Sequence, residues 1–184
     1  IGGQTHPLDL PFFVLATQNP IEQEGTYALP EAQLDRFLLN IILDYLDPEQ
    51  EARMVAETTS PAVASLEPVL SGPQIIELQR LVREVPASQN VIDYAVRLVG
   101  STRPASPEAP ALVKEKVKWG AGSRASQALI LAGKARALLH GRYNVACEDV
   151  RALAIPVLRH RVIPNFHADA EGVTATDIVR RLVE

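Results

Sequence analysis

The chain has 184 residues, which corresponds to one domain or one and a half at about 150 residues per domain. Hydrophobic residues make up 47% and charged residues 22%, as in a globular protein that buries a core, and a mean hydropathy of +0.03 without an apolar run of about 18 residues excludes a membrane-spanning helix. The net charge of −4 gives no general basic field for nucleic acid, and a single cysteine, Cys147, excludes a disulfide framework and a cysteine-based zinc site.

The first 45 residues differ in charge from the rest, because they carry six acids and a single base, Arg36. Two apolar runs, residues 12–17 and 38–43, have the continuous hydrophobicity of strands buried on both faces of a parallel sheet. A polar loop and a short helix over residues 30–37 are predicted between them. Two strands cannot form a stable α/β sheet alone, so we expect the rest of the sheet to precede Ile1 and the chain to be part of a longer protein.

The remainder of the chain predicts a helical bundle. Its first helix, residues 48–58, follows Asp47 as N-cap with Gln50 at the third position. Residues 60–72 are predicted to be a linker, and residues 104–119 an exposed loop with solvated lysines. The other predicted helices are one from Ser71 to the residue before Pro86, one marked by Val91, Ala95, Leu98 and Val99, and three over residues 123–140, 148–158 and 174–183.

No complete active-site motif is present in the sequence. A phosphate-binding loop G-x-x-x-x-G-K-[ST], a metalloprotease H-E-x-x-H and a nucleophile elbow G-x-S-x-G are all missing. Asn19 is a candidate by position, because it follows a predicted buried strand, and ligands of open α/β sheets bind at the carboxyl ends of strands. The alternative is that Asn19 only caps the turn before Pro20.

Two arginines are further candidates. Arg36 is the only cation in the first 52 residues; it can pair with a neighbouring acid or stabilise charge that develops on a phosphoryl group. Arg124 lies in the first turn of the longest predicted helix, where a cation is unfavourable unless an anion is nearby. The glycines at 120 and 122 would let the backbone approach a ligand. The basic run 159–161 could contact phosphate, but cations are favourable at any helix C-terminus.

Residues 12–27, which contain Gln18-Asn19-Pro20, and residues 29–37, which end in Asp35-Arg36-Phe37, closely resemble the MoxR family of AAA+ ATPases. The helical part resembles the small lid domain of that family. The resemblance implies that residues 1–58 form the C-terminal end of the AAA+ α/β core and residues 59–184 the helical lid domain. The fold class expected is therefore an α/β fragment followed by an all-α bundle.

The resemblance also assigns roles to the candidates. Asn19 matches sensor 1, which orients the attacking water; Arg36 matches the arginine finger, which reaches the ATP site of a neighbouring subunit; Arg124 matches sensor 2, which contacts the γ-phosphate from the lid. It implies ATP and magnesium as cofactors, with the phosphate-binding loop and the magnesium ligands outside this chain and no metal site within it. The chain alone is expected to be inactive as an ATPase.

The resemblance further implies a cytoplasmic homo-oligomeric ring, expected as a hexamer, that remodels or matures client proteins, including ones with von Willebrand factor A domains. Two departures concern helix starts: Gly122-Ser123-Arg124 stands where the family commonly has Ser-Pro-Arg, and Ala146-Cys147 stands where it often has Thr-Pro. We therefore expect Ser123 to cap its helix and the helix at 147 to be weakly capped. The alternatives are a non-catalytic lid-type interaction or oligomerisation module and, disfavoured by the net charge, a DNA-translocating relative.

Overall fold

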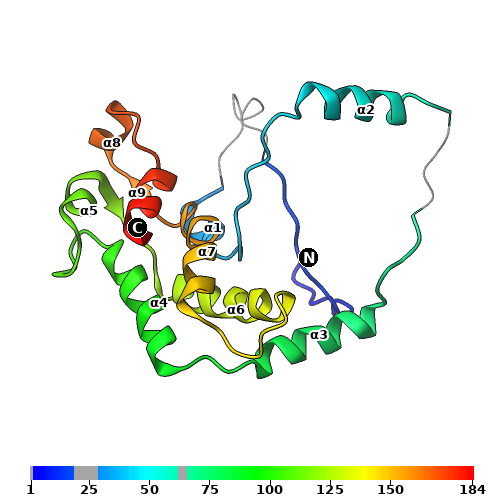
Figure 1. Ribbon diagram of the computed structural model, residues 1–184, viewed down its shortest axis with the longest axis horizontal. Coiled ribbons are helices and arrows are strands. Elements are labelled where there is room, and N and C mark those ends of the chain that lie inside the picture. The colour runs from blue at the N-terminus through cyan, green and yellow to red at the C-terminus, as the bar shows by residue number, and fades with distance from the viewer. Residues whose placement is uncertain (1, 19–28, 62–65) are drawn as a thin grey trace.

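The computed structural model of the chain describes residues 2–18, 29–61 and 66–184, and in this part of the chain the structure is mostly helical with one small two-stranded sheet (Figure 1). In chain order the elements are α1 (Glu31–Leu34), α2 (Pro48–Thr58), α3 (Gly72–Glu84), α4 (Gln89–Ser101), α5 (Ala111–Lys116), β1 (Val117–Trp119), α6 (Ser123–Leu139), α7 (Cys147–Leu158), β2 (Ile163–Pro164), α8 (Phe166–Ala170) and α9 (Ala175–Val183). No helix among the described residues is long and apolar enough to cross a membrane.

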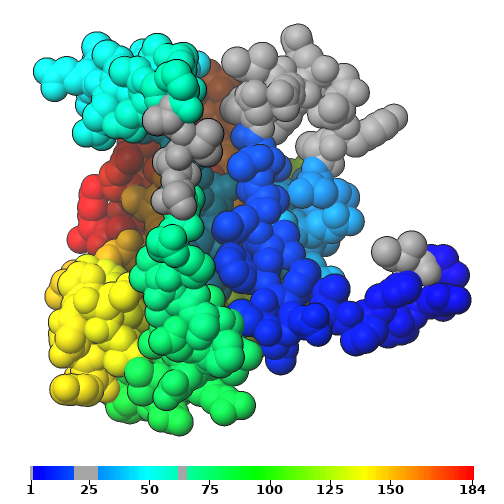
Figure 2. All heavy atoms as spheres, turned by 90° about the vertical axis from the view of Figure 1, so that its right-hand side faces the viewer, coloured from blue at the N-terminus to red at the C-terminus, as the bar shows by residue number. Residues whose placement is uncertain are grey.

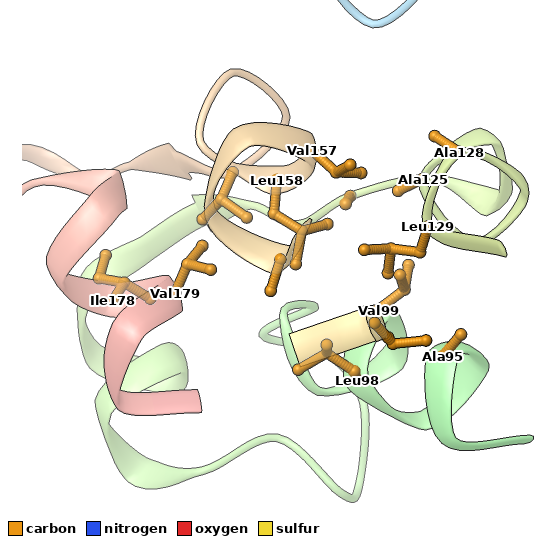
Figure 3. Close-up of a cluster of buried hydrophobic side chains, with 14 of the residues drawn as sticks. Ala95, Leu98, Val99, Ala125, Ala128, Leu129, Val157, Leu158, Ile178 and Val179 are labelled. Carbon is orange, nitrogen blue, oxygen red and sulfur yellow. The ribbon is translucent and has the colours of Figure 1, made fainter. Parts of the chain in front are cut away.

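The hydrophobic core lies between α4, α6, α7 and α9 (Figure 3). The sequence correctly predicts the buried face of α4, and α6 contributes mainly alanines, whose small side chains let the neighbouring helices approach closely. α7 packs against both α6 and α9 and so holds the bundle together. The labelled core side chains in Figure 3 are Ala95, Leu98, Val99, Ala125, Ala128, Leu129, Val157, Leu158, Ile178 and Val179.

The predicted helix boundaries are mostly confirmed because local capping chemistry determines them. Asp47 accepts a 2.8 Å hydrogen bond from the backbone N–H of Gln50 at the start of α2. The Gln74 side chain accepts from the backbone N–H of Ser71 at 2.7 Å at the start of α3. At α7, the expected weak cap is strengthened from within the helix, since Asp149 accepts from the N–H of Ala146 at 2.9 Å.

The prediction that residues 104–119 form an exposed loop is wrong. Pro110 precedes α5, and β1 pairs antiparallel with β2. Val113 and Val117 are buried in the core. These two valines indicate a buried element, but they alternate with lysines, and the lysines led to the prediction of an exposed loop. Lys116 is not solvated either: its side chain is 6% exposed and pairs with Glu115 and Glu171, which supply the charge that a buried ammonium needs.

The two predicted core strands do not form in the described part of the chain. Residues 12–17 and 38–43 belong to neither strand of the sheet. A strand exists only through ladder hydrogen bonds to a partner, and no described segment supplies one. Figure 2 shows the amino-terminal segment, in dark blue, projecting from the body of the molecule. Large apolar side chains of both runs are therefore exposed: Phe12, Phe13, Val14, Leu15, Leu38, Ile41, Ile42 and Leu43.

Candidate functional site

The three candidate residues differ in how the structure places them. Asn19 lies outside the described residues. Arg36 lies two residues beyond the end of α1 and is exposed; its backbone N–H donates to Gln33 O at 3.2 Å, and its side chain has no hydrogen bond or ion pair with any described residue. Arg124 is the second residue of α6, with a side chain that is 52% exposed.

The N-terminus of α6 is attached to the end of α4, and this attachment places Arg124. A Cβ atom on Gly120 would lie 2.4 Å from the carbonyl oxygen of Thr102, so only glycine fits there. The Thr102 hydroxyl accepts from the N–H of Ala121 at 3.0 Å, and Arg103 Nε donates to Ala121 O at 2.9 Å. The close approach that this glycine permits is therefore to the protein's own backbone and not to a ligand, contrary to our expectation.

Gly122, not Ser123, occupies the N-cap position of α6, and no side chain caps the helix. The positive end of the helix is thus left to interact with whatever anion lies near its first turn. In this structure the anion is the carboxylate of Asp35, whose Oδ2 lies 2.6 Å from Nη1 of Arg124. The carboxylate removes the unfavourable effect of a cation at a helix N-terminus.

Asp35 also contacts a second arginine of the helical bundle. Its Oδ1 accepts from Nε of Arg161 at 2.9 Å, so a single carboxylate bridges Arg124 and Arg161. Partial burial acts to raise the pKa of Asp35, but the hydrogen bonds and charges of the two arginines outweigh it and hold the pKa below its usual value. Asp35 is therefore ionised at neutral pH and acts as a fixed negative charge.

Arg161 is buried, with a side chain that is only 1% exposed. Burial lowers the pKa of this arginine, opposed by the Asp35 carboxylate, but an arginine stays protonated in proteins. The guanidinium donates to the carbonyl oxygens of Asp35 and Phe37, at 2.9 and 2.6 Å, and to those of Leu38 and Val157. Arg161 thus connects the end of α7 to the segment that contains Arg36.

His160 adds a contact to the same segment, since its Nε2 lies 3.1 Å from the carbonyl oxygen of Phe37. Burial and the nearby charge of Arg161 lower the pKa of His160, so the neutral ring with its proton on Nε2 donates this bond. Nδ1 of His160 and Nε of Arg159 are buried without a hydrogen-bond partner among the described residues.

The structure brings Arg124 together with Asp35, the residue before Arg36, and it adds Arg161 to the cluster. Sequence reasoning missed Asp35, although an acid directly before the only base of the first 52 residues and a helix-terminal arginine that needs an anion were both available signals. It explained the basic run 159–161, which includes Arg161, by the general preference for cations at a helix C-terminus. The burial of Arg161 depends on tertiary packing, which the sequence pattern does not show.

The exposed arginines at and beside this cluster have chemistry that is compatible with recognition of a phosphoryl group. Arg36 and Arg124 are exposed guanidinium groups, the donors that match phosphate oxygens. Among the described residues there is no group of three or more His, Cys, Asp or Glu side chains that could hold a metal ion.

Comparison with known proteins assigns a family to the amino-terminal part of the chain and to its helical part. Residues 1–39 match the model of the ATPase family associated with various cellular activities (AAA), and residues 109–182 match the AAA lid domain. The backbone agrees with a 2.00 Å crystal structure from Cytophaga hutchinsonii assigned as an ATPase, with a TM-score of 0.91 and 37% identity over 100% of this chain and 56% of that one. The fold and the matches thus define the end of an AAA ATPase module followed by its lid domain.

Three curated relatives narrow this class. The chain is 38% identical to chaperone MoxR1 of Mycobacterium tuberculosis, over 100% of this chain and 48% of MoxR1. It is 40% identical to the uncharacterized protein YeaC of Bacillus subtilis, over 100% of this chain and 55% of YeaC. It is 28% identical to protein MoxR of Methylorubrum extorquens, over 93% of this chain and 53% of that protein. The chain belongs to the MoxR family of AAA ATPases and spans about half the length of these relatives.

Proposed function

We propose that this chain is the part of a MoxR-type ATPase that responds to the γ-phosphate of ATP in its own subunit and in the neighbouring one. The observation that carries the proposal is the arrangement of the two exposed arginines. Arg124 stands at an uncapped helix N-terminus with only a carboxylate of its own chain as partner, and Arg36 lies one residue from that carboxylate with no described partner. The guanidinium of Arg124 can exchange its surface ion pair for a phosphate, and that of Arg36 has no described contact to give up.

The resemblance to the MoxR family supplies each proposed role. Arg124 acts as sensor 2 and contacts the phosphate from the lid of its own subunit. Arg36 acts as an arginine finger in trans, because its side chain projects from the chain without contacting its own lid. Asn19 acts as sensor 1. Bound ATP and magnesium supply the phosphoryl group that is hydrolysed, and the residues that grip the phosphates and the metal belong to other parts of the full-length protein.

We further propose that the full-length protein forms a cytoplasmic ring, a hexamer, which uses ATP hydrolysis for chaperone-like remodelling of client proteins, including ones with von Willebrand factor A domains. The name of the relative MoxR1 as a chaperone supports this class of activity. The residue boundaries proposed for the two parts are 1–58 for the end of the ATPase core and 59–184 for the lid.

The test is Arg36→Ala in the full-length protein. We expect ATP binding to be retained and hydrolysis to fall about 10³-fold or more, the effect of losing an arginine finger. Arg53→Ala is the matched control, because Arg53 is an exposed arginine, 76% exposed, on α2 with only a helix-surface ion pair to Glu57. Unchanged turnover of the Arg36 variant would refute the assignment.

A second measurement uses the 184-residue chain by itself. Because the sequence has no phosphate-binding loop, the purified chain should show no ATP hydrolysis above a buffer blank. Appreciable turnover by the pure chain would contradict the proposal that the phosphate-binding and metal-binding residues lie in other parts of the full-length protein. It would favour a complete active site within these residues.

A further inference from the structure

The end of α7 holds the segment that surrounds Arg36. Besides the Arg161 contacts, the N–H of Asn40 donates to the carbonyl oxygen of Pro156 at 2.8 Å, and Leu39 packs against the hydrophobic core of the bundle. The carbonyl groups of residues 35, 37 and 38 all accept hydrogen bonds from lid side chains. The backbone on both sides of Arg36 is therefore fixed to the lid, while the Arg36 side chain is exposed.

We propose that Arg161 is a positioning residue for Arg36: it fixes the backbone from which the arginine finger projects, so that the lid of one subunit determines how that finger meets the ATP of the neighbouring subunit. This inference rests on the trans role proposed for Arg36. Asp35 completes the arrangement by pairing with Nε of Arg161.

The hydrogen bonds explain why an arginine is needed at position 161. A guanidinium has five N–H donors in a rigid plane, and Arg161 makes five hydrogen bonds: Nε to Asp35 Oδ1, Nη2 to the carbonyls of Asp35 and Phe37, and Nη1 to those of Leu38 and Val157. Lysine keeps the positive charge but has three donors on one atom. A single ammonium group cannot reach the acceptors on Asp35, Phe37 and Leu38 and, at the same time, the carbonyl oxygen of Val157 near the end of α7.

The first experiment is Arg161→Lys in the full-length protein, with ATP hydrolysis measured over a range of ATP concentrations. A finger that is held loosely costs transition-state stabilisation, so we expect kcat to fall about 10- to 100-fold with KM for ATP nearly unchanged. Arg159→Lys is the matched control: Arg159 is on the same turn of the chain, and its Nε has no partner among the described residues. A wild-type kcat for an assembled Arg161→Lys ring would overturn the inference.

The second experiment separates a defect in trans from a general defect of the lid. Arg161→Lys subunits are mixed with subunits that cannot bind ATP because the lysine of their phosphate-binding loop is replaced. In mixed rings the ATP site of an Arg161→Lys subunit faces an intact Arg36, so hydrolysis should rise above that of either protein alone. A defect confined to the subunit's own lid would not be rescued, and that outcome would also overturn the inference.

The same mixture made with Arg36→Ala subunits distinguishes the two proposals. Rescue of Arg36→Ala without rescue of Arg161→Lys leaves the trans finger intact and rejects the positioning role, whereas failure to rescue Arg36→Ala rejects the trans finger itself. If Arg161→Lys does not assemble, Asp35→Asn decides the question, since it keeps the side-chain shape and an accepting oxygen. A smaller loss of kcat that is rescued in mixed rings supports the inference, and wild-type kcat rejects it.

Discussion

The amino-terminal arm, residues 2–18 and 29–61, and the helical bundle, residues 85–183, are both rich in apolar side chains, but only the bundle buries them. Leu15 and Leu43 in the arm are each 87% exposed, whereas Leu129 and Leu158 in the bundle are 0% exposed. The bundle contains the helices that cover one another's apolar faces. The arm's two apolar runs, residues 12–17 and 38–43, have no sheet partner among the described residues, and most of their large side chains stay exposed. An apolar pattern therefore leads to burial only where partner elements cover it.

The largest expected effect comes from truncating a core leucine of the bundle. Leu129→Ala should lower the free energy of unfolding by about 2–5 kcal/mol, because it removes buried contacts and leaves a cavity. Leu15→Ala is the matched control and should change it by less than about 0.5 kcal/mol. Urea denaturation of the 184-residue chain measures both. Equal effects would show that the arm is packed as tightly as the bundle.

The next largest effect is expected at the buried carboxylate of Asp149, which is 0% exposed and pairs with Arg136 at 2.6 Å and with Arg142. Asp149→Asn should destabilise the bundle by about 3 kcal/mol, at the lower end for breaking a buried ion pair, because both arginines are partly exposed. Asp169→Asn, an exposed carboxylate of α8, is the control. If both variants melt like the wild type, this ion pair does not hold α6 to α7.

Acid should weaken the bundle through the same residue. The hydrogen bonds and charge of Arg142, together with the Ala146 N–H and Arg136, outweigh burial and hold the pKa of Asp149 far below its ordinary value of 3.8. Because the folded pKa is depressed, the stabilisation is complete above about pH 4 and is lost as the pH falls toward the folded pKa. The stability difference between wild type and Asp149→Asn should therefore shrink below pH 4 in acid-dependent urea titrations. A pH-independent difference would contradict this.

A smaller effect, seen in association rather than stability, is expected from the arm. Its exposed apolar runs predict that the 184-residue chain self-associates. Leu15→Lys combined with Leu43→Lys should reduce the associated fraction in sedimentation experiments, while Leu139→Lys, at a residue of α6 that is 85% exposed, should change it less. A strictly monomeric wild-type chain would contradict this prediction.

Much of the helical fold could be predicted from the sequence, because its signals are local. Asp47, Ser71 and Thr174 begin their helices where the pattern predicts, since a capping side chain bonds to backbone two or three residues away. The short elements α5, β1, α8 and β2 were missed, because each depends on contacts with distant parts of the chain. The candidate site shows the same limit: Arg124 was found from its place on a helix, whereas its partner Asp35 is 89 residues away in sequence.

The sequence by itself determined most helices of the bundle, that Arg124 stands at a helix start in need of an anion, and that Arg36 is the single base of an acidic segment. The two apolar runs that it predicted as strands form no strand in the described part of the chain. Only the tertiary structure decided which anion Arg124 meets and that Arg161 is buried against the backbone around Arg36. The physical reason is the distance along the chain over which each interaction acts. Caps, helix dipoles and hydrophobic periodicity act over one or two turns, whereas the pairing of Asp35 with Arg161 depends on how α7 packs in the folded molecule.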